Sequence, residues 1–285
     1  MNHNNMNDIH NMDEETVMYN GDIDLTEFGI YDDNLSIKIG ISSIIGTRKY
    51  QQDTVFADKR GDMVIGVVCD GMGGMTSGDL ASKTATQILA EDFYNMPPGV
   101  NISEFLRAEA VKMDRAVADL VNENGEDLGS GTTVVATIIK NNIMYWMSVG
   151  DSRIYVIRNG EIRPINRDHN LRLKLDAELE AGTITMEEYR REESQAEALI
   201  SYIGIGNVPI IDVSIRPIQL IENDIIILSS DGLYKRLSNE EVLTTVMYEE
   251  PDVKRAARRL TDVVMMRTQK SQDNTSVIVM QYNRY

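Results

Sequence analysis

Short apolar runs rich in β-branched residues recur along the chain, and their length restricts the fold more than any other feature. Runs of this length and composition predict strands rather than helices. Asn141-Asn142 separates two of them, and Asn159-Gly160 follows the apolar segment 155–157, so both junctions predict hairpins and largely antiparallel sheets. The runs cover residues 36–45, 63–69, 132–139, 143–149, 210–215, 225–230 and 275–280.

Helical patterns occur in pairs between these runs. One helix is predicted over 77–93, and the next begins at Asn101, with Glu104 three residues later as in a capping box. A later pair begins near Ser238 and near Asp252. Hairpins that alternate with helix pairs predict an α+β fold, a layered α-β-β-α sandwich of two mainly antiparallel β-sheets flanked by helix pairs. One face of the second helix is predicted to be buried, at Leu106, Ala110, Met113, Val117 and Leu120.

Two stretches differ from this pattern. Residues 168–200 are polar and mostly helical around Gly182, which predicts a helical insertion over one edge of the sandwich. Residues 1–35 contain nine acidic residues and no Lys or Arg, which predicts an acidic, flexible tail before a domain spanning 36–285. An apolar cluster within that tail leaves docking on the domain as the alternative; its members are Ile23, Leu25, Phe28, Ile30 and Tyr31.

Net charge and cysteine content limit the partners and the compartment. A formal net charge of −17 argues against binding to nucleic acid or to an anionic membrane. No apolar stretch approaches the roughly 20 residues that cross a bilayer, and the polar start of the chain is unlike a secretory signal. The single cysteine, Cys69, excludes an internal disulfide and fits a reducing cytoplasm, where we expect the protein. The sequence carries no signal for an oligomeric state.

Aspartates fall where predicted strands end. Asp70 follows the run 63–69, Asp231 follows 225–230, and Asp273 comes just before 275–280. Asp151 follows the run 143–149, and a fifth acid, Asp53, follows Arg48 and Gln51-Gln52. Each Asp-Gly alone fits a simple turn. Carboxylates brought together repel each other unless cations bind between them, and an all-oxygen site favours Mg²⁺ or Mn²⁺ over zinc or copper.

Six motifs in this order make the resemblance specific. The chain resembles the metal-dependent serine/threonine protein phosphatases of the type 2C (PPM) family, particularly the compact bacterial members, over about residues 36–285. The motifs are Arg48-x-x-Gln51-Gln52-Asp53, Asp70-Gly71-Met72-Gly73-Gly74 with Gly78 and Ala81-Ser82, Gly131-Thr132-Thr133, Gly150-Asp151-Ser152-Arg153, Ser230-Asp231-Gly232-Leu233 and Asp273-Asn274.

The resemblance implies an activity and its cofactors. Members hydrolyse phosphoserine and phosphothreonine on proteins, the products of Ser/Thr kinases. The attacking water is activated by two Mg²⁺ or Mn²⁺ ions, with a third, weaker ion near a mobile flap, and no covalent phospho-enzyme forms. The flap corresponds to about residues 168–204 of this chain.

Roles follow position by position from the same resemblance. Asp70 matches the acid that bridges both ions, and the carbonyl of Gly71 binds one of them. Asp231 and Asp273 match the acids that complete the shell of the other ion. Asp53 matches an acid that orients metal-bound water, Asp151 an acid linked to the third ion, and Arg48 the arginine that binds the substrate phosphate.

Three positions depart from common forms of the family. Met72 stands where many eukaryotic members have a histidine thought to protonate the leaving group, so the general acid is left open. Gln52 replaces a metal-linked glutamate, and Tyr202 replaces an arginine often seen after the flap. Substrate contacts at Tyr202 are therefore in question.

Other interpretations of single features compete with this one. Cys69 invites a cysteine-phosphatase mechanism, but the sixth residue after it is Met75 rather than arginine, which favours core packing. Gly71-Met72-Gly73 begins a dinucleotide fingerprint whose last glycine position holds Thr76. His169 could transfer protons, although a hinge role through backbone hydrogen bonds is favoured. A non-catalytic relative that binds phosphoproteins or a regulatory partner is the alternative function, and retention of the metal-type acids argues against it.

Overall fold

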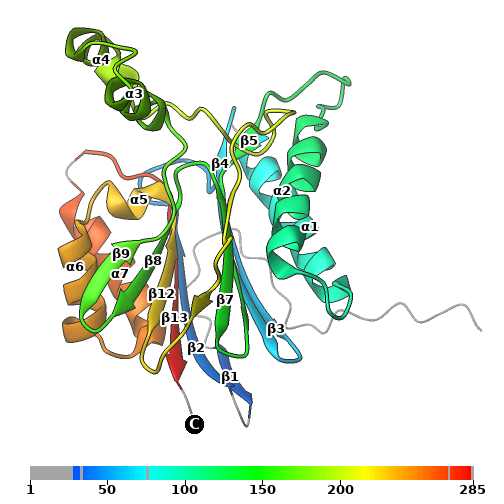
Figure 1. Ribbon diagram of the computed structural model, residues 1–285, viewed down its shortest axis with the longest axis vertical. Helices are drawn as coiled ribbons and strands as arrows, with labels where there is room; N and C mark the ends of the chain where they lie inside the picture. The colour runs from blue at the N-terminus through cyan, green and yellow to red at the C-terminus, as the bar shows by residue number, and fades with distance from the viewer. Residues whose placement is uncertain (1–27, 33–34, 75–76, 269, 284–285) are drawn as a thin grey trace, which may run out of the picture.

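The architecture is a sandwich of two stacked β-sheets with helices on both outer faces (Figure 1). A computed structural model describes residues 28–32, 35–74, 77–268 and 270–283. All strand pairs within the sheets are antiparallel, which confirms the predicted α-β-β-α fold class. Asn141 and Asn159 adopt positive φ in the two predicted hairpin turns, a conformation that asparagine tolerates.

The first sheet has six strands and the second has seven. In spatial order the first contains β1 (Phe28–Asp32), β2 (Leu35–Ile44), β13 (Thr275–Asn283), β12 (Ile225–Ser229), β8 (Arg153–Arg158) and β9 (Glu161–Pro164). The second runs β10 (Asp212–Val213), β7 (Ile143–Val149), β6 (Val134–Lys140), β4 (Met63–Met72) and β3 (Asp53–Arg60), with β11 (Ile218–Gln219) on β7 and β5 (Gly131–Thr132) on β4.

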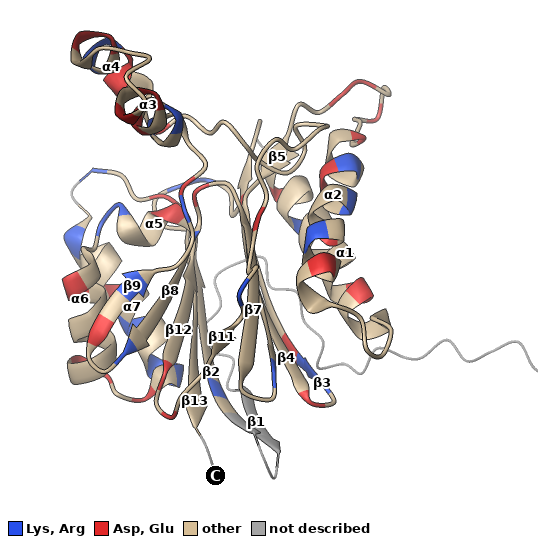
Figure 2. Ribbon diagram, in the orientation of Figure 1, with Lys and Arg blue, Asp and Glu red and all other residues tan. Residues whose placement is uncertain are grey.

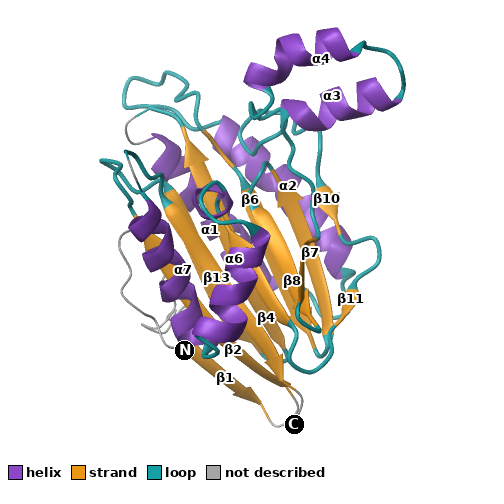
Figure 3. Cartoon of the chain, turned by 90° about the vertical axis from the view of Figure 1, so that its left-hand side faces the viewer, coloured by secondary structure: helices purple, strands orange, loops and turns teal. Residues whose placement is uncertain are grey.

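Helices cover the outer face of each sheet (Figures 1 and 3). Against the second sheet lie α1 (Ser77–Asn95) and α2 (Ile102–Ala118), and against the first lie α6 (Asn239–Thr244), the π-helical turn η2 (Thr245–Glu249) and α7 (Val253–Arg267). Asn101 caps α2 as predicted, and Ser238, where a helix start was predicted, forms a full capping box with Glu241. No helix in the described ranges is long and apolar enough to span a membrane.

Three apolar layers hold the sandwich together. One lies between the sheets, where Ile39, Val68 and Ile278 are fully buried. The other two lie between each sheet and its helices, and Leu106 of α2 and Leu260 of α7 are central to them. Because both faces of the inner strands are covered, these strands carry apolar residues on both sides and do not alternate with polar ones.

The hairpin β1–β2 begins the first sheet. Phe28 pairs with Ile39 and Asp32 with Leu35 along this ladder. Residues 28–32 are therefore a strand, and the predicted flexible tail over 1–35 was wrong for this segment, because backbone pairing extends the sheet through it. The rest of that prediction, over 1–27, lies outside the described residues.

The polar segment predicted as an insertion folds as a helical projection above one end of the sandwich (Figure 3). It contains α3 (Leu171–Glu180), α4 (Met186–Glu192) and the short helix η1 (Glu193–Gln195). Gly182 takes positive φ between α3 and α4, which explains the break there. The helical flap is thus confirmed as a structural element.

Candidate active site

Five aspartates meet at the end of the sandwich below the flap. Asp53 and Asp70 come from β3 and β4 of the second sheet, and Asp151 follows β7 of that sheet. Asp231 begins the short helix α5 (Asp231–Tyr234) directly after β12, and Asp273 precedes β13, both from the first sheet. This end of the fold also carries basic residues beside the acidic ones (Figure 2). Each sheet therefore contributes part of the set.

A cavity of about 310 Å³ opens between these residues. Its lining contains all but one of the predicted site residues, namely Arg48, Asp70, Gly71, Asp151, Asp231 and Asp273. Asp53 does not line it, because the Asp53 side chain is fully buried beneath the cavity floor. The structure thus brings the predicted residues to one place and sets Asp53 one layer deeper.

The glycines after two of these aspartates allow very close backbone approach. A Cβ atom on Gly71 would lie 2.1 Å from the carbonyl oxygen of Gly78, at the start of α1. A Cβ atom on Gly232 would lie 2.1 Å from the carbonyl oxygen of Asn274, beside Asp273. Any side chain at either position would push these segments apart. The Asp-Gly pairs are therefore required by packing around the cavity and are more than turn signals.

Burial and mutual repulsion raise the pKa values of the inner carboxyl groups. Burial raises the pKa of Asp53 to about 7, and the charges of Asp231 and Asp273 add to the effect against hydrogen bonds from Ser230 and Ser276. Burial, together with the charges of Asp53 and Asp231, holds the pKa of Asp70 well above its usual range. Burial raises the pKa of Asp151 to about 6, with a further rise from Asp231. Without cations to compensate their charges, these carboxyl groups do not all ionise readily.

Hydrogen bonds fix Asp53 but leave one of its oxygens free. The Ser230 hydroxyl donates to Asp53 Oδ2 at 2.8 Å, while Asp53 Oδ1 is buried and has no hydrogen-bond partner in the structure. Asp231 Oδ1 is likewise buried without a partner. Buried carboxylate oxygens without partners are costly. Both atoms suit a further ligand, such as a cation or an ordered water.

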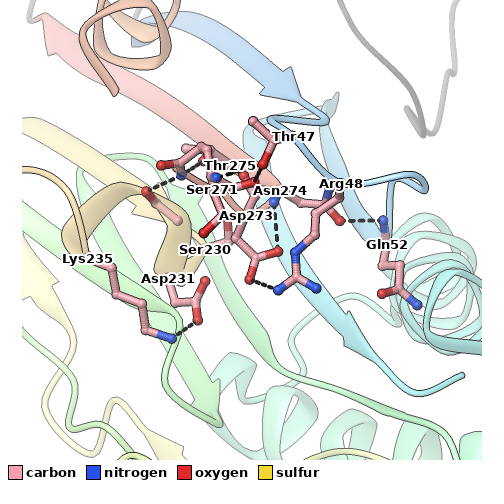
Figure 4. Close-up of polar contacts among 12 residues, drawn as sticks. Thr47, Arg48, Gln52, Ser230, Asp231, Lys235, Ser271, Asp273, Asn274 and Thr275 are labelled. Atoms are coloured by element: carbon pink, nitrogen blue, oxygen red, sulfur yellow. Dashed lines mark hydrogen bonds and ion pairs between the residues drawn. The ribbon is translucent and has the colours of Figure 1, made fainter. Parts of the chain in front are cut away.

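The outer carboxylates are paired with cations of the chain itself (Figure 4). Arg48 Nη2 lies 2.5 Å from Asp273 Oδ2, and Lys235 Nζ pairs with Asp231 Oδ2. As these side chains stand, no three His, Cys, Asp or Glu groups of the described residues are arranged to hold a metal ion. Both carboxylates from the first sheet are instead paired with cations of the chain, Asp273 with Arg48 and Asp231 with Lys235.

The donor set nevertheless fits divalent cations of the hard type. It consists of carboxylates, a nearby backbone carbonyl at Gly71 and no cysteine or imidazole at the cavity wall within the described part of the chain. Such oxygen sets suit Mg²⁺ and Mn²⁺. Raised carboxyl pKa values and unpartnered buried oxygens are the state expected of a site whose repulsion a cation relieves.

Asn274 and Gln52 hold the loop that carries Arg48. Asn274 Nδ2 donates to the carbonyl oxygens of Ile45 and Tyr50, at 2.9 and 3.1 Å, and its Oδ1 accepts from the Gln52 amide at 2.8 Å. Gln52 Nε2 lies 3.4 Å from the Gly74 carbonyl oxygen. In this structure Gln52 and Asn274 therefore position the Arg48 loop against Asp273.

His169 anchors the flap and does not line the cavity. Its side chain is fully buried, its Nδ1 accepts from the Gly150 amide at 3.2 Å, and its own amide donates to the Gly150 carbonyl at 2.9 Å. Its Nε2 lies 3.3 Å from Asp212, which Arg167 also pairs. The predicted hydrogen bonding of His169 to the backbone is confirmed, and these bonds fix the backbone beside Asp151.

The flap reaches the cavity through its last residues. Glu197 and Leu199 line the cavity wall, and Arg172 of α3 pairs with Glu197 at 3.0 Å. The ring of Tyr202 packs so closely on Gly131 that a Cβ there would lie 2.6 Å from the ring. Tyr202 therefore packs against β5 in this structure, where the family pattern has an arginine.

Burial also decides between the competing interpretations of the strand β4. Cys69 is fully buried, and burial raises the pKa of its thiol to about 12. A thiol in that state is not a nucleophile at neutral pH, so the cysteine-phosphatase interpretation is wrong. The glycines after β4 lead into α1 as a dinucleotide fingerprint would, but Asp70 occupies the place where a pyrophosphate would bind.

Sequence reasoning did not single out several residues around the site. Lys235 was missed, although its place four residues after Asp231 predicts an ion pair if a helix begins at Asp231. Tyr234 was missed too: the Arg153 guanidinium stacks 3.6 Å above its ring and pairs with Asp168, at 2.6 Å. Asp114, far away in sequence, binds the loop after the flap through three backbone amides.

A four-layered sandwich with a carboxylate-lined cavity between its two sheets defines the class of metal-dependent phosphatases. A family model described as protein phosphatase 2C matches residues 42–268, most of the chain. The chain therefore belongs to the protein phosphatase 2C family and is a protein phosphatase. This confirms the resemblance found in the sequence.

Individual relatives agree with this assignment. The serine/threonine phosphatase stp of Listeria welshimeri is 28% identical over 244 residues, which cover 83% of this chain and 92% of that protein. The structure of the Mycobacterium tuberculosis serine/threonine phosphatase PstP/Ppp matches with a TM-score of 0.72 at 26% identity, covering 87% of this chain and 99% of that one. The catalytic domain of PstP in complex with 2 manganese ions matches with a TM-score of 0.70 at 26% identity, covering 88% and 99%.

Proposed function

We propose that this phosphatase hydrolyses phosphoserine and phosphothreonine on proteins phosphorylated by Ser/Thr kinases, with two Mg²⁺ or Mn²⁺ ions held by Asp70, the Gly71 carbonyl, Asp231 and Asp273. One observation carries the proposal: acids from two separate sheets line one cavity, where burial raises the pKa of Asp70 and Asp231 keeps a buried oxygen without a hydrogen-bond partner. The single cysteine and the net charge of −17 further support a cytoplasmic protein without nucleic-acid partners.

When bound, the two ions would supply an activated water and neutralise charge on the transferring phosphoryl group. Asp70, on β4, lines the same cavity as Asp231 and Asp273 and would be a ligand of the ions. Asp231 offers its free Oδ1, and Asp273 offers its carboxylate once Arg48 releases it. These residues bind and space the ions.

Arg48 is the group suited to bind the substrate phosphate. Its guanidinium is more than half exposed at the cavity mouth, where it reaches Asp273. A planar guanidinium binds phosphate oxygens in pairs, so a phosphorylated side chain would compete well for it. We infer that Arg48 moves from Asp273 to the substrate.

Asp53 acts on the site from beneath the cavity floor. Its buried carboxylate is fixed by Ser230 and has one free oxygen, so it can orient a water molecule through a hydrogen bond. The flap residues Glu197 and Leu199 line the same cavity and would therefore lie beside the peptide around the phosphorylated residue.

Phosphate release from a phosphothreonine peptide tests the proposal. Release should require Mn²⁺ or Mg²⁺, stop with chelator, and fall at least a thousandfold in Asp273→Ala. A phosphotyrosine peptide of the same sequence is the matched control and should be a poor substrate. Release that persists in chelator, or in Asp273→Ala, would contradict the assignment.

A further inference from the structure

Lys235 brings a cation of the chain into the carboxylate cavity. It follows the single turn of α5 and pairs its Nζ with Asp231 Oδ2, four residues earlier (Figure 4). The same cavity is lined by Asp70 and Asp151. About half of the Lys235 side chain is exposed, so no packing requirement holds its ammonium group there. The position is therefore set by charge.

Because of the ion pair with Lys235, the two carboxylate oxygens of Asp231 have different surroundings. Oδ2 pairs with Lys235, whereas Oδ1 is buried and has no hydrogen-bond partner in the structure. One oxygen is thus neutralised by the chain, and the other stays available to a bound ion. The Lys235 ammonium group also interacts electrostatically with Asp151, because its positive charge counteracts part of the rise in the Asp151 pKa.

Charge balance then limits how many divalent ions the cavity needs. Five aspartates surround or underlie it, namely Asp53, Asp70, Asp151, Asp231 and Asp273, and the sixth carboxylate at its wall, Glu197, is already paired with Arg172. Two divalent ions and the Lys235 ammonium together balance five negative charges and leave Arg48 for the phosphate. A third divalent ion beside Asp151 and Asp231 would carry excess positive charge and would be repelled by the ammonium.

We propose that Lys235 serves as a permanent, tethered cation beside Asp231 and Asp151, so that the protein binds two divalent ions and excludes a third from that place. This inference rests on the proposed function, which supplies the first two ions. Asp151 is then a partner of the Lys235 ammonium rather than a metal ligand. A tethered ammonium neutralises this part of the site at any metal concentration, which a weakly bound ion does not.

Counting bound manganese tests the inference without relying on activity. Titration calorimetry or spin resonance of free Mn²⁺ should give two ions per chain for the wild type. Lys235→Met should gain a third ion, at least tenfold tighter than any residual binding to the wild type, and Lys235→Asp should bind that ion more tightly still. Lys83→Met is the matched control, because Lys83 forms the same i, i+4 pair with Asp79 on α1. It should remain at two.

The outcomes separate this inference from the proposed function. Two ions in the wild type and in both Lys235 variants would overturn the role of Lys235 alone. Three ions in the wild type would do the same. No manganese binding by folded wild-type protein would overturn both proposals. Circular dichroism of each variant in chelator verifies folding, which an exposed lysine should not affect.

Discussion

Asp53 and Asp70 are direct partners across the antiparallel pair β3–β4, one at the start of its strand and the other near the end. Register alone therefore holds two carboxylates next to each other on neighbouring strands at this end of the sheet. Asp53 is enclosed completely, and Asp70 reaches the cavity wall. The repulsion between them is built into the sheet and does not depend on side-chain flexibility.

This arrangement predicts an unusual pH dependence of stability in chelator. The folded-state pKa values of Asp53 and Asp151 rise from 3.8 to about 7 and about 6, so the unfolded chain binds fewer protons in that window. Stability should therefore fall as pH rises from about 4 to 7. Asp53→Asn should flatten the fall, by up to about 4 kcal/mol at pH 8. Denaturant unfolding at pH 5 and pH 8 measures the free energy of unfolding of the wild type and of the variant. An equal fall in this free energy in the variant would contradict the prediction.

Removing the charge of Asp70 should separate activity from stability. Asp70→Asn is expected to lose at least a thousandfold in kcat while its melting temperature in chelator stays equal or rises, because a repelling charge is gone. Saturating Mn²⁺ should stabilise the wild type by about 3 kcal/mol at a hundredfold excess over Kd, and the variant much less. Asp62→Asn, in the exposed β3–β4 turn, is the control and should behave as the wild type.

Arg48 should affect substrate binding more than metal binding. Arg48→Ala is expected to lower kcat/KM by about ten- to a hundredfold, mostly through KM, and Arg48→Lys should recover part of the loss. Mn²⁺ affinity should not fall, because Arg48 competes for Asp273. Steady-state kinetics and manganese titration measure both effects, with Arg163→Ala as an exposed control. A large loss of bound metal would refute the phosphate-binding role.

Asp114 should support the root of the flap. Its carboxylate is buried and accepts from the amides of Gly204, Gly206 and Val208, at 2.8, 3.2 and 3.0 Å. Asp114→Ala removes the acceptor for all three and is expected to cost about 2 kcal/mol, or roughly 5 °C in melting temperature. Asp119→Ala, exposed at the end of the same helix, is the control. Limited proteolysis should cut the flap faster only in the first variant.

Much of the fold was predictable because its strands and helix starts carry local signals. Hairpin asparagines and capping residues lie where the sequence indicated, and so does the apolar face of α2, except that Leu120 follows the helix and is only partly buried. The strand β3 was missed, since only three apolar residues stand between charged ends. Val55 and Phe56 nevertheless pack into two different layers. The strand β1 was assigned to the tail, because its pairing with β2 is not visible in acidic composition.

The candidate site was predictable as a set of residues but not as a geometry. Strand-end aspartates and their glycines pointed to one place, whereas the depth of Asp53 and the pairing of Asp231 with Lys235 depend on tertiary contacts. No local pattern reveals which carboxylate oxygen is left without a partner. The anchoring of the flap by Asp114 joins residues about ninety positions apart and is equally invisible in sequence.

The division of the carboxylates between two sheets has a consequence during synthesis of the chain. Asp70 is made early, but Asp273 belongs to the loop before β13, which comes after all the other described strands along the chain. A nascent chain therefore lacks one of the proposed metal ligands until nearly all the other described elements have been made, so its metal site stays incomplete until then. Activity would begin only when β13 pairs with β2 on one side and β12 on the other, which joins the two parts of the first sheet.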